Sequence, residues 1–182
     1  MKLLIVFWLV FTLGRTGFAQ LPDKIVTALQ GNYDLVDAVL TVGECPSRLS
    51  AEYKWEESLG LAQLYLVDVS SGTGEYFQDL AYVDKARYSE FEDDAIIPTR
   101  LKRALYETNI EKSETGFILT NILQRQSRKN WFSDWIAWFS KTIMLDYDEK
   151  ASVLNVTVKK MRPGGEFPVL LDVACKYQKN IL

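Results

Sequence analysis

The side chains that could catalyse a reaction are few in this sequence. It contains no histidine, the residue that most often acts as a general base near neutral pH, and no Gly-x-Ser-x-Gly nucleophile motif. Glu52 and Glu56 could work as a pair of carboxylates, but the strand alternation around them places both on a solvated outer face. The sequence therefore predicts a protein that is not an enzyme.

Two short stretches could bind an ion or a phosphate group. An acidic cluster lies between Glu90 and Asp94, but it lacks the ligand spacing of a calcium loop and is typical of solvated surface. Gly72 and Gly74 lie between two strand-like stretches, without the following helix that a phosphate-binding glycine loop needs. We therefore expect no metal and no cofactor.

The first residues are typical of a secretory signal peptide. A charged start is followed by the apolar run Leu3–Leu13, and Gly17 and Ala19 supply small residues at the minus-three and minus-one positions of a cleavage site. We expect residues 1–19 to be removed and residues 20–182 to form one domain, since single domains commonly contain ~100–200 residues. This predicts an exported protein, either periplasmic or extracellular.

The charge balance argues against nucleic acid as a partner. The chain carries 21 Lys and Arg residues and 24 Asp and Glu residues, a net charge of −3, and loss of Lys2 and Arg15 with the signal peptide makes it −5. The sequence has no block of basic residues long enough to follow a phosphate backbone. We therefore expect no contact with nucleic acid, and the sequence favours no particular oligomeric state.

The chain has two cysteines, Cys45 and Cys175. An even pair in an exported protein most simply forms a disulfide. Two free thiols or a two-cysteine metal site is the alternative, but such a metal site would lack histidine partners. A Cys45–Cys175 disulfide would tie an early strand to the last one and stabilise the fold by ~4–5 kcal/mol in the chain-entropy model.

Runs of alternating apolar and polar residues predict an all-β protein. A short helix is expected over 21–30, and about nine strand-like runs follow it at short intervals. These runs are 33–42, 49–56, 61–69, 76–83, 101–110, 115–124, 141–148, 152–161 and 167–177. Most connections suit neighbour-to-neighbour hairpins, which favours an antiparallel up-and-down β-barrel.

Gly31-Asn32-Tyr33 follows the predicted helix and begins the first strand. A Gly-x-Trp motif at this place marks the lipocalin-like group of the calycin superfamily, which this chain resembles with Tyr33 in place of the tryptophan. For the late basic residue that packs on the tryptophan in that group, Arg162 and Lys176 are candidates. The resemblance implies a secreted carrier whose barrel binds a small hydrophobic molecule or lipid.

The alternation places six side chains on the inner face of such a barrel, as candidate ligand contacts. They are Tyr53, Trp55, Phe117, Leu119, Leu145 and Val156. Eight strands enclose an interior just wide enough for one small ligand, but side chains alone can also fill it. These six residues could therefore be core rather than binding site, and both interpretations stand at this point.

The segment 127–141 carries three tryptophans at helical spacing. Trp131, Trp135 and Trp138 stand at i, i+4 and i+7, which predicts a second short helix with the indole rings on one stripe. That helix could close one end of the barrel as core, or form a lid that contacts the ligand. It could instead lie on a membrane surface. The last interpretation gives an alternative function, a non-enzymatic cell-envelope protein that contacts a membrane or a protein partner through 127–141.

Overall fold

The computed structural model describes residues 21–56, 61–70, 72, 74–83, 87–92, 101–128, 135–162 and 169–180. The predicted signal peptide over 1–19 lies outside these ranges, as do Trp131 and the end of the acidic cluster at Asp93 and Asp94.

The described chain contains one helix and ten strands. In chain order they are α1 (Asp23–Leu29), β1 (Gly31–Val42), β2 (Arg48–Glu56), β3 (Leu61–Asp68), β4 (Glu75–Ala81), β5 (Arg87–Glu92), β6 (Leu101–Lys112), β7 (Gly116–Arg128), β8 (Trp135–Asp148), β9 (Val153–Met161) and β10 (Val169–Lys179).

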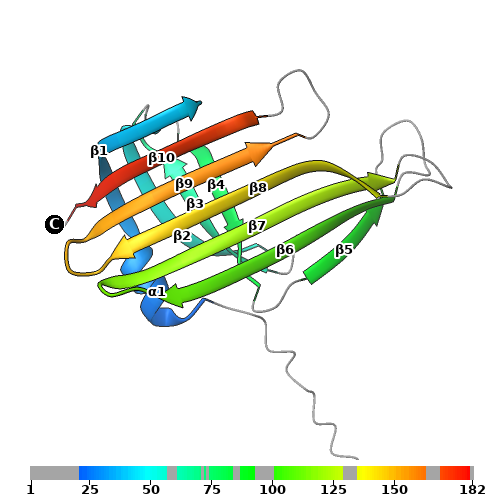
Figure 1. Cartoon of the computed structure of the whole chain (residues 1–182). Helices are drawn as coiled ribbons and strands as arrows, with labels where there is room; N and C mark the ends of the chain where they lie inside the picture. The colour runs from blue at the N-terminus through cyan, green and yellow to red at the C-terminus, as the bar shows by residue number, and fades with distance from the viewer. Residues whose placement is uncertain are drawn as a thin grey trace, which may run out of the picture.

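The ten strands form one antiparallel sheet in the order β4-β3-β2-β1-β10-β9-β8-β7-β6-β5. Neighbours in the sheet are also neighbours in the chain, apart from β1 and β10, which pair with each other. The sheet curls into a nearly closed barrel with β4 and β5 as its two edges (Figure 1). The prediction of an all-β antiparallel barrel with a short first helix is confirmed.

The sequence prediction missed β5. It has no strand between 83 and 101, whereas the structure pairs Arg87–Glu92 with β6, from Arg87↔Tyr106 to Glu92↔Leu101. Pairing with β6 satisfies the backbone hydrogen bonds of β5 whatever its side chains are. The charged side chains therefore gave no sign of a strand.

α1 lies at one end of the barrel, next to the β8–β9 turn. Pro22 precedes α1, and the Pro22 carbonyl accepts hydrogen bonds from the Ile25 and Val26 amides. Gly31 ends the connection with a φ of 140°, a conformation that other residues rarely adopt. A Cβ atom at Gly31 would also meet Cε of Lys179 at 2.8 Å. Within the described residues no helix is long and apolar enough to span a membrane.

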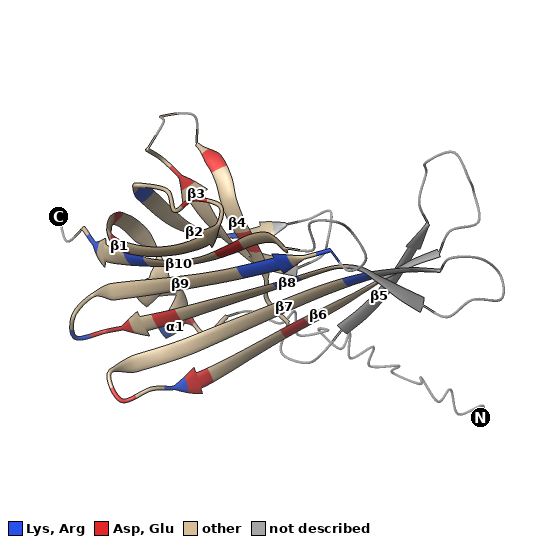
Figure 2. Ribbon diagram, turned by 45° about the horizontal axis from the view of Figure 1, so that its top comes forward, with Lys and Arg blue, Asp and Glu red and all other residues tan. Residues whose placement is uncertain are grey.

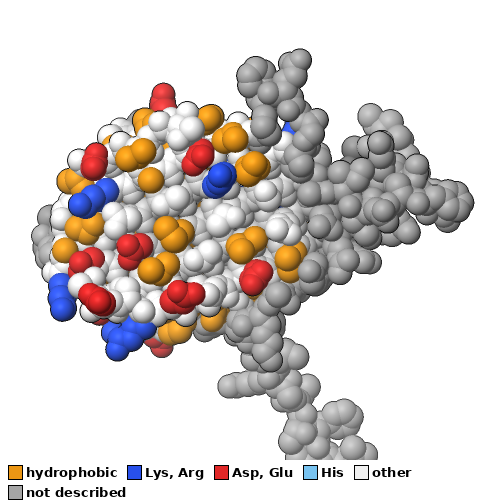
Figure 3. Space-filling model, in the orientation of Figure 1, with side chains coloured by type: hydrophobic (Ala, Val, Ile, Leu, Met, Phe, Trp, Pro, Cys, Tyr) orange, Lys and Arg blue, Asp and Glu red, His pale blue; other side chains and the backbone are white. Residues whose placement is uncertain are grey.

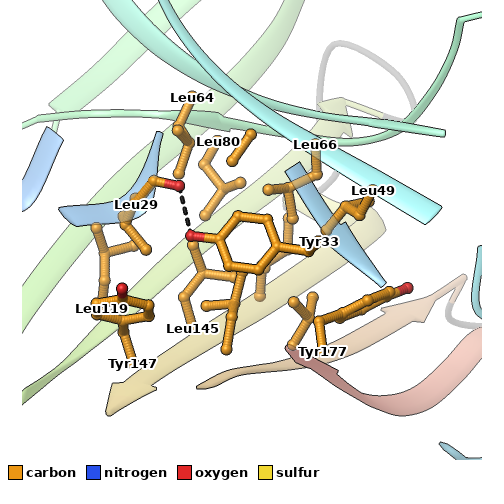
Figure 4. Close-up of a cluster of buried hydrophobic side chains, with 14 of the residues drawn as sticks. Leu29, Tyr33, Leu49, Leu64, Leu66, Leu80, Leu119, Leu145, Tyr147 and Tyr177 are labelled. Carbon is orange, nitrogen blue, oxygen red and sulfur yellow. Dashed lines mark hydrogen bonds between the residues drawn. The ribbon is translucent and has the colours of Figure 1, made fainter. Parts of the chain in front are cut away.

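The core of the barrel packs against α1. Leu29 is fully buried, and the Tyr33 hydroxyl donates a hydrogen bond of 2.6 Å to its carbonyl oxygen (Figure 4). The other largest fully buried side chains come from β1, β2, β3, β7, β8, β9 and β10; they are Tyr33, Tyr177, Leu49, Leu64, Leu66, Leu119, Ile143, Leu145, Leu154, Val156 and Val158. This end of the barrel is therefore filled by side chains.

The disulfide between Cys45 and Cys175 is present, as predicted, with the two Cα atoms 5.8 Å apart. It ties the segment between β1 and β2 to β10. The Tyr177 hydroxyl supports the same connection by donating a hydrogen bond of 3.0 Å to the Pro46 carbonyl. The start of β2 is thereby held against the last strand.

The predicted helix over 127–141 is wrong for the residues that the structure describes. β7 continues to Arg128, and β8 begins at Trp135, so both Trp135 and Trp138 lie in a strand. Arg125 pairs with Phe139 and the next residue of β7 pairs with Ala137, which leaves Trp138 as one extra residue in β8. Aromatic residues also favour strands, and pairing with β7 outweighs the helical spacing.

Candidate functional site

The outer surface of the barrel offers little for a hydrophobic ligand. On the face that Figure 3 shows, apolar side chains are interspersed with acidic and basic ones. A hollow of about 430 Å³ opens beside the disulfide, where the core-packed Phe77 and Leu171 reach the surface, and another of about 490 Å³ lies beside α1. Glu44, Asp68 and Glu75 make the first acidic, and charges of both signs line the second. The inner face is the better place to look.

The inner face near α1 is solidly packed. Of the predicted ligand contacts, Phe117, Leu119, Leu145 and Val156 all lie here, each at most 6% exposed and each part of the main core cluster. A cavity beside Leu119 has a volume of only about 10 Å³, about enough for one water molecule. These four side chains are part of the filled interior next to α1, which we call the packed floor of the barrel.

Of the two predicted contacts on β2, Tyr53 packs against that cluster. Tyr53 is half-buried, and its hydroxyl accepts a hydrogen bond of 2.9 Å from the Leu21 amide. Trp55, two residues further along the strand, is 41% exposed. Trp135 and Trp138 lie in β8 beyond Phe139, and Trp131 lies outside the described residues. Of the predicted contacts whose side chains the structure describes, five therefore share one packed cluster, and Trp55 is partly exposed.

A polar group of residues lies beyond the packed floor and links β4 to strands on the other side of the barrel. Asn121 is buried, and its Nδ2 donates hydrogen bonds to the Ala81 carbonyl (2.7 Å) and the Thr108 hydroxyl (3.0 Å). The Thr108 hydroxyl in turn donates to the same carbonyl at 3.1 Å. Side chains of β6 and β7 therefore hold the edge strand β4 in place across the open seam, which is the gap between the sheet edges β4 and β5.

Lys141 makes a second link to β4. It is 6% exposed, and its Nζ donates to both the carboxylate (2.8 Å) and the backbone carbonyl (2.9 Å) of Asp79. Burial lowers the pKa of Lys141; Asp79 offsets part of this effect, and the cations Lys160 and Arg125 lower the pKa further. Lys141 is therefore a buried cation with two more cations close to it.

These three residues, Arg125, Lys141 and Lys160, form a cation cluster on adjacent strands β7, β8 and β9. Lys141 and Lys160 are direct partners across the β8–β9 pair, so both side chains lie on the inner face. The Arg125 guanidinium carbon and the Lys160 Nζ lie 5.5 and 5.4 Å from the centroid of the Phe139 ring. The Arg125 Nε is buried and has no hydrogen-bond partner.

The cation cluster lies at the end of the described barrel away from α1. Figure 2 shows the basic stretch at the end of β9, far from the turn that β9 shares with β8 beside α1. Arg125, Phe139 and Lys160 are half-buried, in contrast to the packed floor. This part of the inner face combines apolar side chains with a few polar groups that converge on it, as small-molecule sites do.

The positions of the three cations in the sequence are themselves a signal for this cluster. Lys141 lies two residues before Ile143 and Lys160 two residues after Val158, in phase with the buried side chains of their strands. Arg125 likewise lies two residues after Leu123. Continuing the inner-face alternation through these residues would have placed all three cations inside the barrel.

Among the described residues, no group of three or more cysteine or acidic side chains is arranged to hold a metal ion. Comparison of the chain with protein-family models, with curated proteins and with solved structures finds no match. The function is therefore argued from the barrel interior alone.

Proposed function

We propose that the protein is an exported carrier that binds a small hydrophobic molecule inside the barrel, in the half that faces away from α1. The proposal rests on a change in burial along the inner face. Leu145 in the packed floor is fully buried, whereas Phe139 and Arg125 are half-buried. A concave, largely apolar surface with a few convergent polar groups is the usual form of a small-ligand site.

The disulfide supports the location that the proposal needs. Disulfides such as Cys45–Cys175 persist in oxidising compartments and are rare in the cytosol, which suggests a location outside the cytosol. Together with the predicted signal peptide over 1–19, this favours a protein of the periplasm or the extracellular space.

One contact supports the lipocalin-like character of the barrel. Nζ of Lys179 lies 5.8 Å from the centroid of the Tyr33 ring and donates a hydrogen bond of 2.6 Å to the Ala28 carbonyl in α1. A late basic residue thus covers the aromatic ring of the Gly31-Asn32-Tyr33 motif. Arg162 and Lys176, the candidates from the sequence, are both exposed, so Lys179 takes this role in the proposed relationship.

Native mass spectrometry of mature protein from its own host, before and after extraction with organic solvent, tests the carrier function. We expect an additional mass that disappears on extraction. A mass equal to that of the protein alone, both before extraction and after incubation with a lipid extract of the host, would contradict the proposal. It would favour the alternative contact surface at 127–141, which predicts that Trp135→Ser weakens membrane or partner association without loss of folding.

A further inference from the structure

We propose that the cation cluster binds the anionic head group of the ligand, so that the cargo is an amphiphile with a carboxylate, sulfate or phosphate group rather than a neutral lipid. This inference rests on the proposed carrier function and names the class of ligand that the barrel holds.

The arrangement of the cluster fits an anion. Lys141 and Lys160 face each other directly on neighbouring strands, and like charges in such positions repel. The structure pairs Lys141 with Asp79, so the three cations and this carboxylate leave an excess of two positive charges. An anion bound between the strands would turn this repulsion into attraction.

Arg125 supplies a donor that lacks an acceptor. Its Nε is buried without a hydrogen-bond partner, and an unsatisfied buried donor is costly. A planar guanidinium donates in the fork geometry that carboxylate and phosphate oxygens accept. The Phe139 ring beneath it restricts where the guanidinium can lie, which leaves a donor already positioned for an oxygen atom.

The packed floor sets the direction of the ligand. Beyond Asn121, towards α1, the cavity has a volume of about 10 Å³, which leaves no room for an alkyl chain. The head group must therefore lie innermost, at the level of Lys141 and Lys160, and the chain must extend away from α1 past Phe139.

The test compares ligands that differ only in the head group. Mature, delipidated protein with its disulfide intact is titrated with dodecanoate, dodecyl phosphate and dodecanol by isothermal calorimetry. We expect both anions to bind at least about tenfold more tightly than the alcohol, the effect of one charge-assisted hydrogen bond. We also expect sodium chloride to weaken binding of the anions but not of the alcohol. A preference for one anion over the other distinguishes a carboxylate cargo from a phosphate cargo.

Two neighbouring lysines of β9 provide matched variants. Lys160→Gln removes a cation of the cluster, whereas Lys159→Gln removes the same charge from the exposed outer face. We expect Lys160→Gln to weaken dodecanoate binding by about tenfold and Lys159→Gln to leave it unchanged, with dodecanol affinity the same in both. Arg125→Gln is the second cluster variant and should behave as Lys160→Gln does.

Equal affinities for dodecanoate, dodecyl phosphate and dodecanol, or equal effects of the two lysine variants, would overturn the head-group inference and leave the carrier proposal standing. Failure of all three ligands to bind would overturn both.

Discussion

Lys141 on β8 donates hydrogen bonds to the carboxylate and to the backbone carbonyl of Asp79 on β4, joining two strands that are not neighbours in the sheet. Two edges of the sheet remain unpaired with each other, and this contact draws β4 towards the inner face of β8. The same lysine belongs to the cation cluster, so one side chain contributes both to closing the barrel and to the candidate site.

This relationship predicts unequal effects of removing its two partners. Asp79→Ala leaves the buried Lys141 without its counter-charge, which should lower the free energy of unfolding by ~2 kcal/mol, less than for a fully buried pair because Asp79 is 49% exposed. Lys141→Met keeps an apolar stem of similar length and removes a desolvated charge, so we expect a change below ~1 kcal/mol. Urea denaturation measures both. A larger loss in Lys141→Met than in Asp79→Ala would contradict this assignment.

The seam between β4 and the far strands depends on Asn121. Asn121→Ala removes the hydrogen bonds to Ala81 and Thr108, and we expect the free energy of unfolding to fall by ~2 kcal/mol, the net contribution of two hydrogen bonds. The amide of Val83, which donates to the Thr108 hydroxyl, should exchange its hydrogen faster in the variant. Asn109→Ala removes an exposed asparagine and is the control; an equal loss there would argue against the seam.

Stability should fall as the pH rises above 10. Burial raises the pKa of Tyr33 and Tyr177, and coulombic interactions with Tyr147 and Asp68, respectively, add to it. The unfolded chain then releases these protons at lower pH than the folded protein, so stability is complete below pH ~10 and is lost above it by ~1.4 kcal/mol per pH unit for each tyrosine. Denaturation at a series of alkaline pH values should show a shallower decline in Tyr177→Phe. A decline that Tyr177→Phe leaves unchanged, or that the exposed Tyr76→Phe reduces as much, would contradict this account.

The disulfide should contribute a large part of the stability. It closes a loop with a sequence separation of 130 residues, and the chain-entropy model gives ~5 kcal/mol for a loop of that length. The double variant Cys45→Ser, Cys175→Ser should therefore unfold at a much lower urea concentration than the oxidised protein. Reduction of the unaltered protein should reproduce the shift. A midpoint that neither change moves would show that the hydrogen bond from Tyr177 to Pro46 holds this connection without the disulfide.

The inner face of the barrel could be predicted from the sequence where it is apolar. The alternation identified Leu145 on β8 and Val156 on β9 as inner-face side chains, and the structure buries both completely. Residues of one strand face alternate, so a run of apolar residues at every second position identifies the core face directly.

The same rule extends to the candidate site, but it was not applied there because the residues are charged. Arg and Lys are almost never fully buried, so residue type outweighed the alternation at Lys141 and Lys160. Their mutual repulsion also depends on the register between β8 and β9, which a single strand pattern does not contain. The helix prediction for the tryptophans was wrong for a different reason. Their i, i+4, i+7 spacing fits a helix locally, and only the pairing of β8 with β7 shows that Trp135 and Trp138 lie in a strand.

The most direct test of the carrier account is a methyl NMR titration of the mature protein with dodecanoate, because it locates the ligand. Binding inside the barrel should give the largest shifts at Leu123 and Leu171, which pair with Lys141 and Lys160 across their strands, and little change at Leu154 in the packed floor. Shifts confined to Val39 on the exposed part of β1, with Leu123 and Leu171 unmoved, would place the ligand outside the barrel and contradict the account.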